Sequence, residues 1–550
     1  MIIKKEKRPE IICIIILTLL PMITAVVWKI FNPDIASLLT SEWNDELFYF
    51  KQVEAIIDHS YPLGYYGFNE SHALSLSFAA WSPVLVWPWV LLGSIFPWTL
   101  NSVYVFNILI YMTAMLLFAL FVRPDVKQTI GIGLWFLAFF LNVRYMYSCM
   151  PEVICFAHLI VFWGLMLGYF KKRSEDKAKG MGMLVAAIAL SMLMTFMRPY
   201  LILFLAFALL VLLVNSEGKK KKLIAFGICV VIMGITAFIY YLLNHYLSAE
   251  YLMPFFYTDF ITTFFTDGFG PGVHNLFGTL YYKGRDFLQY MKDAFYIDRA
   301  AGIFFWWFLV MMLLQLVESI LEGLSLKKKS STASDAGDDS AEKGAASAKV
   351  RPDVKGAFYS RVYMLFADFA FLVALLLMYK LTEGSKHLLT FIMAGVILMI
   401  MESKRGLVFG GIMCVCVIYF GAFHCVGNAY DFGIPRITTE SDVRYLYWQR
   451  AFADGIELDS SLVPSYKNAI IWEFSDNVDG ESVTTDWQML YALPSGTGIS
   501  CCMNYTASNF KDIKCRYISA PSGGEIEELC IEAGYRLIGR DDRFCVYARY

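Results

Sequence analysis

The stretch IICIIILTLLPMITAVVW, residues 11–28, is a long apolar run without a single charged side chain. Runs of about 18 or more apolar residues match the roughly 30 Å hydrocarbon thickness of a bilayer. Comparable uncharged runs recur further along the chain, at residues 101–122, 223–244 and 406–424. The pattern predicts an all-α polytopic membrane protein.

The composition agrees with this prediction. The chain has 550 residues, of which 58% are hydrophobic and 17% charged, and its mean hydropathy is +0.53. Soluble proteins have about 45–50% apolar and about 25% charged residues. The net charge of −2 gives no electrostatic reason to expect a nucleic-acid partner, whereas membrane lipids are expected partners.

The first run follows the basic residues Lys4, Lys5, Lys7 and Arg8, as a signal peptide would. It is too long for a typical signal core, and no small-x-small cleavage pattern follows it. An uncleaved first span is therefore the favoured interpretation.

Short basic segments separate the runs and predict their orientation, because Lys and Arg concentrate in cytoplasmic loops. The basic segments are residues 4–8, 123–127, 171–179, 219–222, 327–329 and 404–405. If all of them are cytoplasmic, the spans lie near 10–30, 101–122, 129–147, 152–170, 181–197, 199–215, 223–243, 301–323, 357–379, 386–402 and 406–424. This predicts a multi-pass plasma-membrane protein with a cytoplasmic N-terminus and an external C-terminus. Residues 81–98, WSPVLVWPWVLLGSIFPW, are short and rich in proline, so an interfacial or re-entrant segment and two short crossings both stay open.

The remaining segments define the domain organisation. The first membrane block is residues 1–326, with outer loops 31–82 and 244–300; in the second loop Phe287, Tyr290, Met291 and Ala294 have the spacing of a surface helix. Residues 327–356 lack large apolar side chains and are predicted to be a disordered cytoplasmic linker. The second membrane block is residues 357–424.

Residues 425–550 are polar enough to form an extracytoplasmic α/β domain. AIIWEF (469–474) and MLYAL (489–493) have strand-like composition, GEIEELCIEAG (524–534) is an amphipathic helix, and the last sixteen residues predict a hairpin that turns at 540–542. Six cysteines lie here, at positions 425, 501, 502, 515, 530 and 545. Disulfides and small core residues are both consistent with them.

The first outer loop contains SEWNDELFYF, residues 41–50, where three carboxylates lie among aromatic rings. A helix over 43–57 would place Trp43, Leu47 and Phe50 on one stripe, with Asp45 and Glu46 on neighbouring positions. The acids would then point into the protein, or simply form the solvated face of an interfacial helix.

A first span followed by an external loop that opens with Asp-Glu and aromatic residues resembles the GT-C superfamily of membrane glycosyltransferases. Further short motifs agree in order and sidedness: MPEVICFAH with Glu152, FMRPYLILF with Arg198, and EGSKHLLTF with Lys386 and His387, where many members have Arg-Tyr. The resemblance covers most of residues 1–424. Where many members have a His-Pro-Pro-Leu-like motif, this chain has Trp81-Ser82-Pro83-Val84, so no histidine role is carried over.

The resemblance implies a GT-C-like bundle of about 11–13 transmembrane helices. It further implies inverting transfer of a sugar from a polyprenyl-phosphate-linked donor to an extracytoplasmic acceptor. Asp45 would be the catalytic base with Glu46 beside it, Glu152 would support the site, and Arg198, Lys386 and His387 would bind the donor. Arg285 is a further candidate for the phosphate, with contact to lipid headgroups as the alternative.

In some branches of the superfamily the acid binds a metal, so a divalent cation such as Mg²⁺ or Mn²⁺ stays open. The sequence also leaves open a non-catalytic transporter or lipid flippase, for which ionisable residues inside spans would matter. His158 and Asp368 are such residues, but each is isolated, which favours a helix–helix hydrogen bond.

Overall fold

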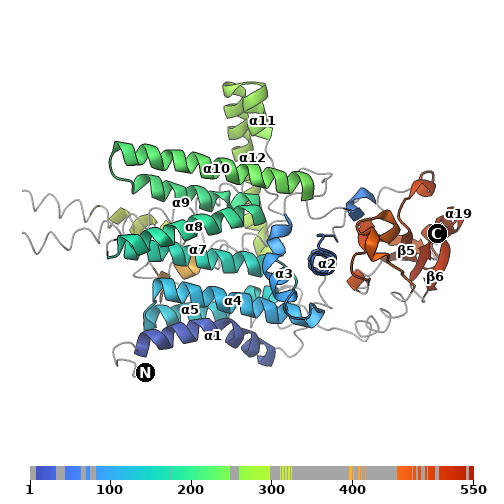
Figure 1. The fold of residues 1–550 in the computed structure, drawn as a ribbon, viewed down its shortest axis with the longest axis horizontal. Helices are drawn as coiled ribbons and strands as arrows, with labels where there is room; N and C mark the ends of the chain where they lie inside the picture. The colour runs from blue at the N-terminus through green and yellow to red at the C-terminus, as the bar shows by residue number, and fades with distance from the viewer. Residues whose placement is uncertain are drawn as a thin grey trace, which may run out of the picture.

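The computed structural model describes residues 8–31, 44–63, 70–74, 82–173, 175–247, 259–297, 455–472, 475–478, 481–484, 490–491, 493–501, 507–540 and 544–550, with scattered residues in 310–324 and 395–415. Lys386, His387, Asp368 and the 327–356 linker lie outside these residues. The described part consists of a bundle of apolar helices and a small C-terminal sheet domain (Figure 1). The predicted fold class, a helical membrane protein with an α/β domain, is confirmed.

The first half of the bundle begins with α1 (Arg8–Phe31) and continues with α4 (Leu100–Val122), α5 (Val126–Ala138), α6 (Phe140–Met146) and α7 (Glu152–Lys172). The second half contains α8 (Lys177–Met197), η5 (Pro199–Leu201), α9 (Ile202–Val214) and α10 (Lys219–Leu247). Five helices, α1, α4, α7, α8 and α10, are long and apolar enough to cross a bilayer among the described residues. The predicted span 129–147 is interrupted at Phe139, where α5 ends and α6 begins.

Helix α7 is the centre of the bundle, and α10 lies at its periphery. Within their most apolar windows, 94% of α7 is buried by protein but only 11% of α10. Gly164 of α7 faces the backbone of Phe118 of α4, and a Cβ atom there would lie 3.1 Å from the Phe118 Cα. Small residues permit such close helix contacts in membranes. Side chains of α10 such as Leu223 and Phe238 are exposed, as expected for the lipid-facing side of a membrane span.

The two ends of the bundle differ in charge. At one end Arg123 pairs with Glu10 at 3.1 Å, Lys171 donates to the Val122 carbonyl, and Arg173 donates to Asn215. This basic end therefore carries the starts of α1 and α8 and the ends of α4, α7 and α9. The opposite end, here called the domain end, carries α2 (Asn44–His59), η4 (Pro83–Val86), α3 (Trp87–Gly93) and the sheet domain (Figure 1).

Residues 81–98 do not form a spanning helix in the part that the structure describes. The run of η4 and α3, Pro83–Gly93, is 11 residues and about 16 Å long, roughly half the hydrocarbon thickness. Ser82 begins the run by accepting a hydrogen bond from the Val84 N–H. The segment packs beside α2, α4 and α8, so it belongs to the domain end of the bundle.

The C-terminal domain has a five-stranded sheet in the order β4-β1-β5-β7-β6. Its strands are β1 (Ala469–Trp472), β4 (Gly498–Cys501), β5 (Tyr517–Pro521), β6 (Arg536–Arg540) and β7 (Phe544–Ala548), and α19 (Glu525–Glu532) packs beside β5. β1 is parallel to β4 and β5, whereas β7 is antiparallel to β5 and β6. A separate hairpin joins β2 (Ser475–Val478) to β3 (Glu481–Thr484).

The predicted strand in AIIWEF, the helix and the C-terminal hairpin are confirmed. The predicted strand MLYAL is wrong at Leu490 and Tyr491, which form a 3-10 turn buried against the bundle. Cys515, Cys530 and Cys545 are unbonded and buried in the core of this domain. For these three cysteines the structure favours small core residues over disulfides.

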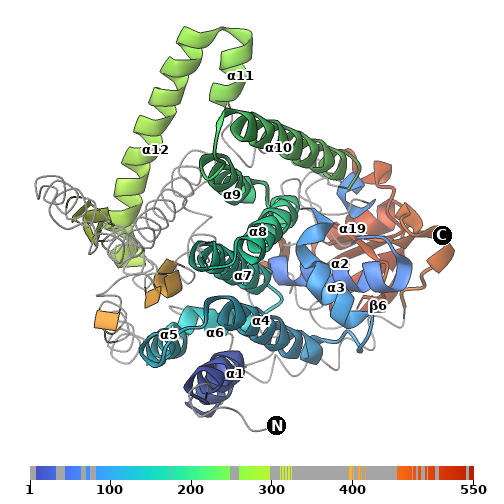
Figure 2. The ribbon, with the colours of Figure 1, turned by 60° about the vertical axis from the view of Figure 1, so that its left-hand side comes forward.

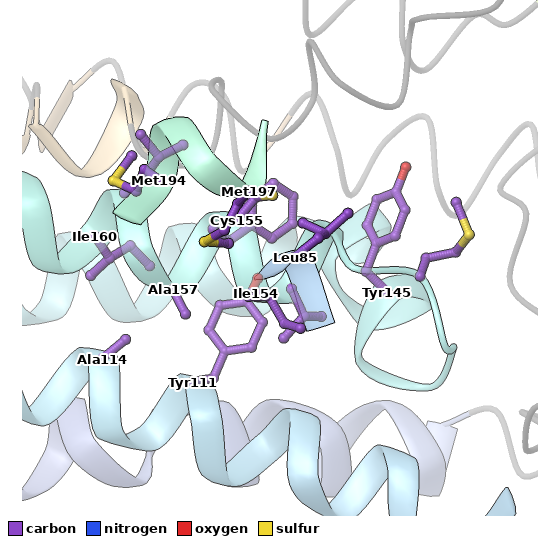
Figure 3. Close-up of a cluster of buried hydrophobic side chains, with 14 of the residues drawn as sticks. Leu85, Tyr111, Ala114, Tyr145, Ile154, Cys155, Ala157, Ile160, Met194 and Met197 are labelled. Carbon is purple, nitrogen blue, oxygen red and sulfur yellow. The ribbon is translucent and has the colours of Figure 1, made fainter. Parts of the chain in front are cut away.

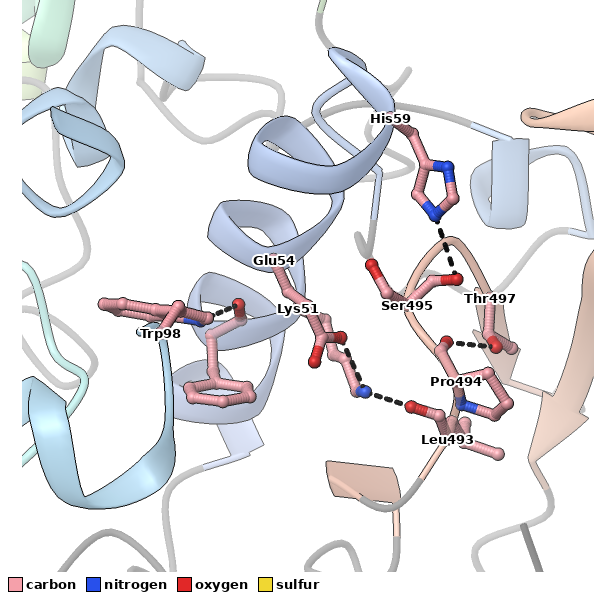
Figure 4. Close-up of polar contacts among 9 residues, drawn as sticks. Lys51, Glu54, His59, Trp98, Leu493, Pro494, Ser495 and Thr497 are labelled. Carbon is pink, nitrogen blue, oxygen red and sulfur yellow. Dashed lines mark hydrogen bonds and ion pairs between the residues drawn. The ribbon is translucent and has the colours of Figure 1, made fainter. Parts of the chain in front are cut away.

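The first outer loop joins the bundle to the sheet domain. Lys51 of α2 donates to the Leu493 carbonyl, and the Nε2 atom of His59 lies 3.1 Å from the Ser495 carbonyl oxygen (Figure 4). In η3 (Glu70–Leu74), Glu70 accepts hydrogen bonds from the backbone N–H groups of Lys514 and Cys515. Helix α2 is thus fixed between the bundle and the domain.

Candidate functional site

The predicted carboxylates and Arg198 meet at the domain end of α7 and α8. Asp45 and Glu46 occupy the first turn of α2, Glu152 begins α7, and Arg198 follows the last residue of α8. Pro199 comes directly after Arg198, and the residue before a proline is restricted to extended backbone. Arg198 indeed has φ −142° and ψ 119°, which ends α8.

Arg198 and Glu152 form a buried ion pair. The Arg198 Nη2 atom lies 2.8 Å from Glu152 Oε1, and the two side chains are 1% and 0% exposed. The Arg198 Nη1 atom donates to the Tyr200 hydroxyl at 3.0 Å. A buried charge is tolerated only with such partners, so the two residues depend on one another.

Tyr49 connects this pair to the acids of α2. It lies one helical turn after Asp45 and is buried. Burial and, next, the charge of Asp45 raise the pKa of Tyr49 well above its ordinary value, Arg198 lowers it, and Glu152 raises it. The Tyr49 phenol therefore interacts electrostatically with all three residues and stays protonated at neutral pH.

Glu46 has a different environment from that of Asp45. Glu46 is 1% exposed, and its Oε2 atom accepts a hydrogen bond of 3.1 Å from the Cys149 N–H, in the turn before α7. Asp45 is partly exposed. Glu46 thus holds the start of α2 against the bundle, whereas Asp45 is the acid that a substrate could reach.

An apolar groove of about 290 Å³ lies deeper in the bundle, between α3, α4, α7 and α8. Its walls include Leu91, Leu109, Ala157 and Leu190. Ala157 follows Glu152 by five residues, about 8 Å along α7, and Leu190 precedes Arg198 by eight residues, about 12 Å along α8. The polar cluster and the groove therefore share two helices, with the cluster at their ends.

His158, in the groove wall, is accounted for by its hydrogen bonds. Its Nε2 atom accepts from Trp87 Nε1 at 3.2 Å, and its Nδ1 atom lies 2.7 Å from the Ile154 carbonyl oxygen. Because an indole N–H only donates and a carbonyl only accepts, the imidazole is neutral with its proton on Nδ1. The expected helix–helix hydrogen bond of His158 is confirmed.

The core below the polar cluster is closely packed. Figure 3 shows Ile154, Cys155 and Ala157 of α7 between Tyr111 and Ala114 of α4 and the methionines at the end of α8. All of these side chains are buried. The polar cluster therefore rests on a rigid apolar base, which fixes the positions of its side chains.

Arg285, another predicted phosphate ligand, lies elsewhere. It is on α12 (Phe269–Ile297) with its side chain 66% exposed, next to Asp286 and over the ring of Tyr282. The predicted ligands Lys386 and His387 are outside the described residues. In the part of the chain that the structure describes, Arg198 is thus the predicted cation that joins the cluster.

Sequence reasoning missed two partners in the cluster, Tyr200 and Cys149. Tyr200 could have been found because it follows the Arg-Pro pair in MRPY. The contact of Glu46 with the Cys149 N–H had no sequence signal, since 103 residues separate them and any residue but proline offers the same N–H. Over the described residues, no group of three or more His, Cys, Asp and Glu could hold a metal ion.

Comparison with known proteins gives one structural likeness. No family model matches the chain, and no curated protein matches its sequence. The solved structures include a match to the crystal structure of ArnT from Cupriavidus metallidurans in the apo state. The identity is 12% and the TM-score 0.39, over 96% of this chain and 97% of that chain. Because a TM-score below 0.5 does not establish a common fold, the contacts described above, and not this likeness, are the basis for a functional assignment.

Proposed function

We propose that the protein is a GT-C-type membrane glycosyltransferase that moves a sugar from a polyprenyl-phosphate-linked donor to an acceptor at the domain end of the bundle. The observation that carries the proposal is the convergence of Asp45, Glu152 and Arg198 around Tyr49. These residues come from three separate parts of the chain, and the sequence motifs singled them out in advance. Charged groups buried at a membrane surface are retained where they have a function.

The arrangement suits an amphiphilic donor. The apolar groove between α3, α4, α7 and α8 matches an isoprenoid chain in character, and the charged cluster lies at the ends of two of its helices. A donor with its tail in the groove would have its phosphate at the ends of α7 and α8, near the positive charge of the buried Arg198 guanidinium. Glu152 keeps that guanidinium charged and oriented, and a fixed cation stabilises the charge that grows on a departing phosphate.

In the proposed reaction Asp45 acts as the general base. The acceptor hydroxyl gives its proton to the Asp45 carboxylate as its oxygen forms a bond to the anomeric carbon. The bond between that carbon and the phosphate oxygen breaks, and the lipid phosphate leaves with the electron pair. Attack from the face opposite the phosphate inverts the configuration. Glu46 stays bound to the Cys149 N–H and positions the helix that carries Asp45.

The test is sugar transfer by the full chain in lipid nanodiscs, from a polyprenyl-phosphate-linked sugar to a mixture of acceptors. Asp45→Asn is expected to lower the transfer rate by a factor of about 10²–10⁴, the usual contribution of a general base. Asp58→Asn is the matched control, because Asp58 is an exposed carboxylate on the same helix. The configuration of the product, read from the anomeric coupling constant, tests inversion.

Four outcomes would contradict the proposal or part of it. Undiminished transfer by Asp45→Asn would remove Asp45 as the base. Retained configuration would exclude direct displacement. If the donor is never consumed while a lipid-linked substrate still crosses the bilayer, the chain is a transporter. A requirement for Mg²⁺ or Mn²⁺ would reassign Asp45 from base to metal ligand.

A further inference from the structure

The hairpin of α11 (Asp259–Thr266) and α12 extends from the bundle and has an exposed apolar face. It runs across the direction of α10 and reaches beyond the other helices (Figures 1 and 2). Gly268, with φ +95°, allows the tight connection between the two helices. Nothing in the function proposed above uses this hairpin.

One face of α12 packs against α11. Asn275 donates to the Thr263 hydroxyl of α11 at 2.9 Å, and within α12 the Thr279 hydroxyl donates to the Asn275 side chain at 3.4 Å. Gly272 lies against the ring of Phe264, where a Cβ atom would be only 2.4 Å away. Positions 272, 275 and 279 follow helical spacing, so they define the inner face of α12.

The opposite face of α12 is an apolar stripe without protein cover among the described residues. Phe277, Tyr281 and Leu288 follow i, i+4 and i+11 spacing and are 65%, 69% and 66% exposed. Arg285 and Lys292 are exposed and lie along one side of this stripe on the helical wheel, next to Tyr281. An apolar stripe bordered by cations is typical of helices that lie in a membrane interface.

The surroundings of the hairpin identify lipid as the occupant. Helix α10, which precedes the hairpin in the chain, is long and apolar enough to cross a bilayer, and only 11% of its most apolar window is buried by protein. Near its last residues the rings of Tyr241 and Tyr246 are 60% and 70% exposed, as in the aromatic belts of membrane proteins. The hairpin therefore starts close to headgroup depth and runs across the direction of the spans.

We propose that α12 lies in the bilayer interface with Phe277, Tyr281 and Leu288 in the acyl boundary, and that Arg285 and Lys292 bind the phosphates of anionic lipids. In this arrangement Arg285 is a headgroup contact and not part of the polar cluster of Arg198. The inference does not depend on the proposed glycosyl transfer.

The experiment uses the full chain in nanodiscs, with an environment-sensitive fluorophore on a single introduced cysteine. Tyr281→Cys reports on the stripe. Asp286→Cys is the matched control, since it is 58% exposed and about 180° away from Phe277 on the same helix. The parent chain, with its 12 native cysteines, is labelled in parallel to set the background.

Lipids with a nitroxide on the acyl chain are expected to quench the probe at position 281 at least twofold more than the probe at 286. Raising phosphatidylglycerol from zero to 30% should increase quenching at 281, and Arg285→Gln with Lys292→Gln should abolish that increase. Equal quenching at both positions, or disulfide-linked dimers of Tyr281→Cys that show a second copy on the stripe, would overturn the interfacial placement. An unchanged response in the double variant would overturn the role of the two cations.

Discussion

At the scale of single residues, the pairing of Arg198 with Glu152 determines what each can do. An arginine at 1% exposure would be strongly destabilising without a counter-charge, and Glu152 at 0% exposure has the same requirement. The pair therefore keeps both side chains ionised in a buried position, where neither charge would be tolerated without the other. A side chain that interacts with a phosphate must carry a positive charge. The structural and the proposed catalytic roles of Arg198 therefore depend on the same contact with Glu152.

Glu152→Gln is expected to destabilise the protein, because it leaves the Arg198 guanidinium buried without its counter-charge. Breaking such a pair at one partner costs about 3–5 kcal/mol. Glu10→Gln removes the carboxylate of the Arg123 pair, in which the side chains are 51% and 33% exposed, and should cost about 1 kcal/mol or less. Apparent melting temperatures of the two purified variants would check this. A decrease for Glu152→Gln no larger than that for Glu10→Gln would show that the buried pair contributes little.

At the scale of elements, α2 is the part that connects the site to the rest of the molecule. Its first turn carries Asp45 and Glu46, and the ring of Phe50 stacks on Trp98 at 5.2 Å. On the side of the sheet domain, Lys51 is 3% exposed and pairs with Glu54 at 2.8 Å while donating to the Leu493 carbonyl (Figure 4). A shift of the sheet domain would thus reach Asp45 through one rigid helix.

Lys51→Met should loosen α2, since the Leu493 carbonyl and Glu54 both lose a buried partner, at about 1–3 kcal/mol for an unsatisfied group. Amide hydrogen exchange in residues 45–59 is expected to become faster, and the transfer rate to fall with the donor KM unchanged. The control is Lys172→Met, because Lys172 forms the same i,i+3 pair with Glu175 at the basic end, where Glu175 is 56% exposed. If α2 exchanges at the parental rate in Lys51→Met, the contact does not hold the helix.

Elements built from long apolar runs could be predicted from the sequence, and those that depend on distant contacts could not. The spans now seen as α1, α4, α7 and α8 match the predicted ranges closely, because run length alone sets them. The helix break at Phe139 could not be predicted, because no proline or glycine lies at this position or next to it. MLYAL has the composition of a strand, yet Leu490 and Tyr491 pack into the same apolar core as the bundle, and this tertiary contact overrides local propensity.

At the scale of the whole molecule, the site is formed where two parts of the chain meet. Asp45 and Glu46 come from the first outer loop, which is held through Glu70 and Lys514 by a domain more than 400 residues later. Sequence order predicted that these residues lie on the same side of the membrane, because the basic loops alternate with the spans. It could not predict that η3 lies against β4, where a side chain at Gly498 would collide with the Ala73 carbonyl. The charge pattern predicts on which side of the membrane a loop lies, whereas the docking of η3 against β4 depends on the shapes of the two surfaces.

The distribution of charge over the two ends predicts how the molecule is placed in the membrane. The basic end should be cytoplasmic and the sheet domain external, because Lys and Arg are retained on the cytoplasmic side. Glu175→Cys lies between α7 and α8 at the basic end, and Glu525→Cys lies on α19; both positions are exposed. In intact cells a membrane-impermeant maleimide should label Glu525→Cys above the background of the parent chain, and Glu175→Cys only after permeabilisation. The reverse pattern would place Asp45 and Arg198 on the cytoplasmic side, where an extracytoplasmic acceptor could not reach them.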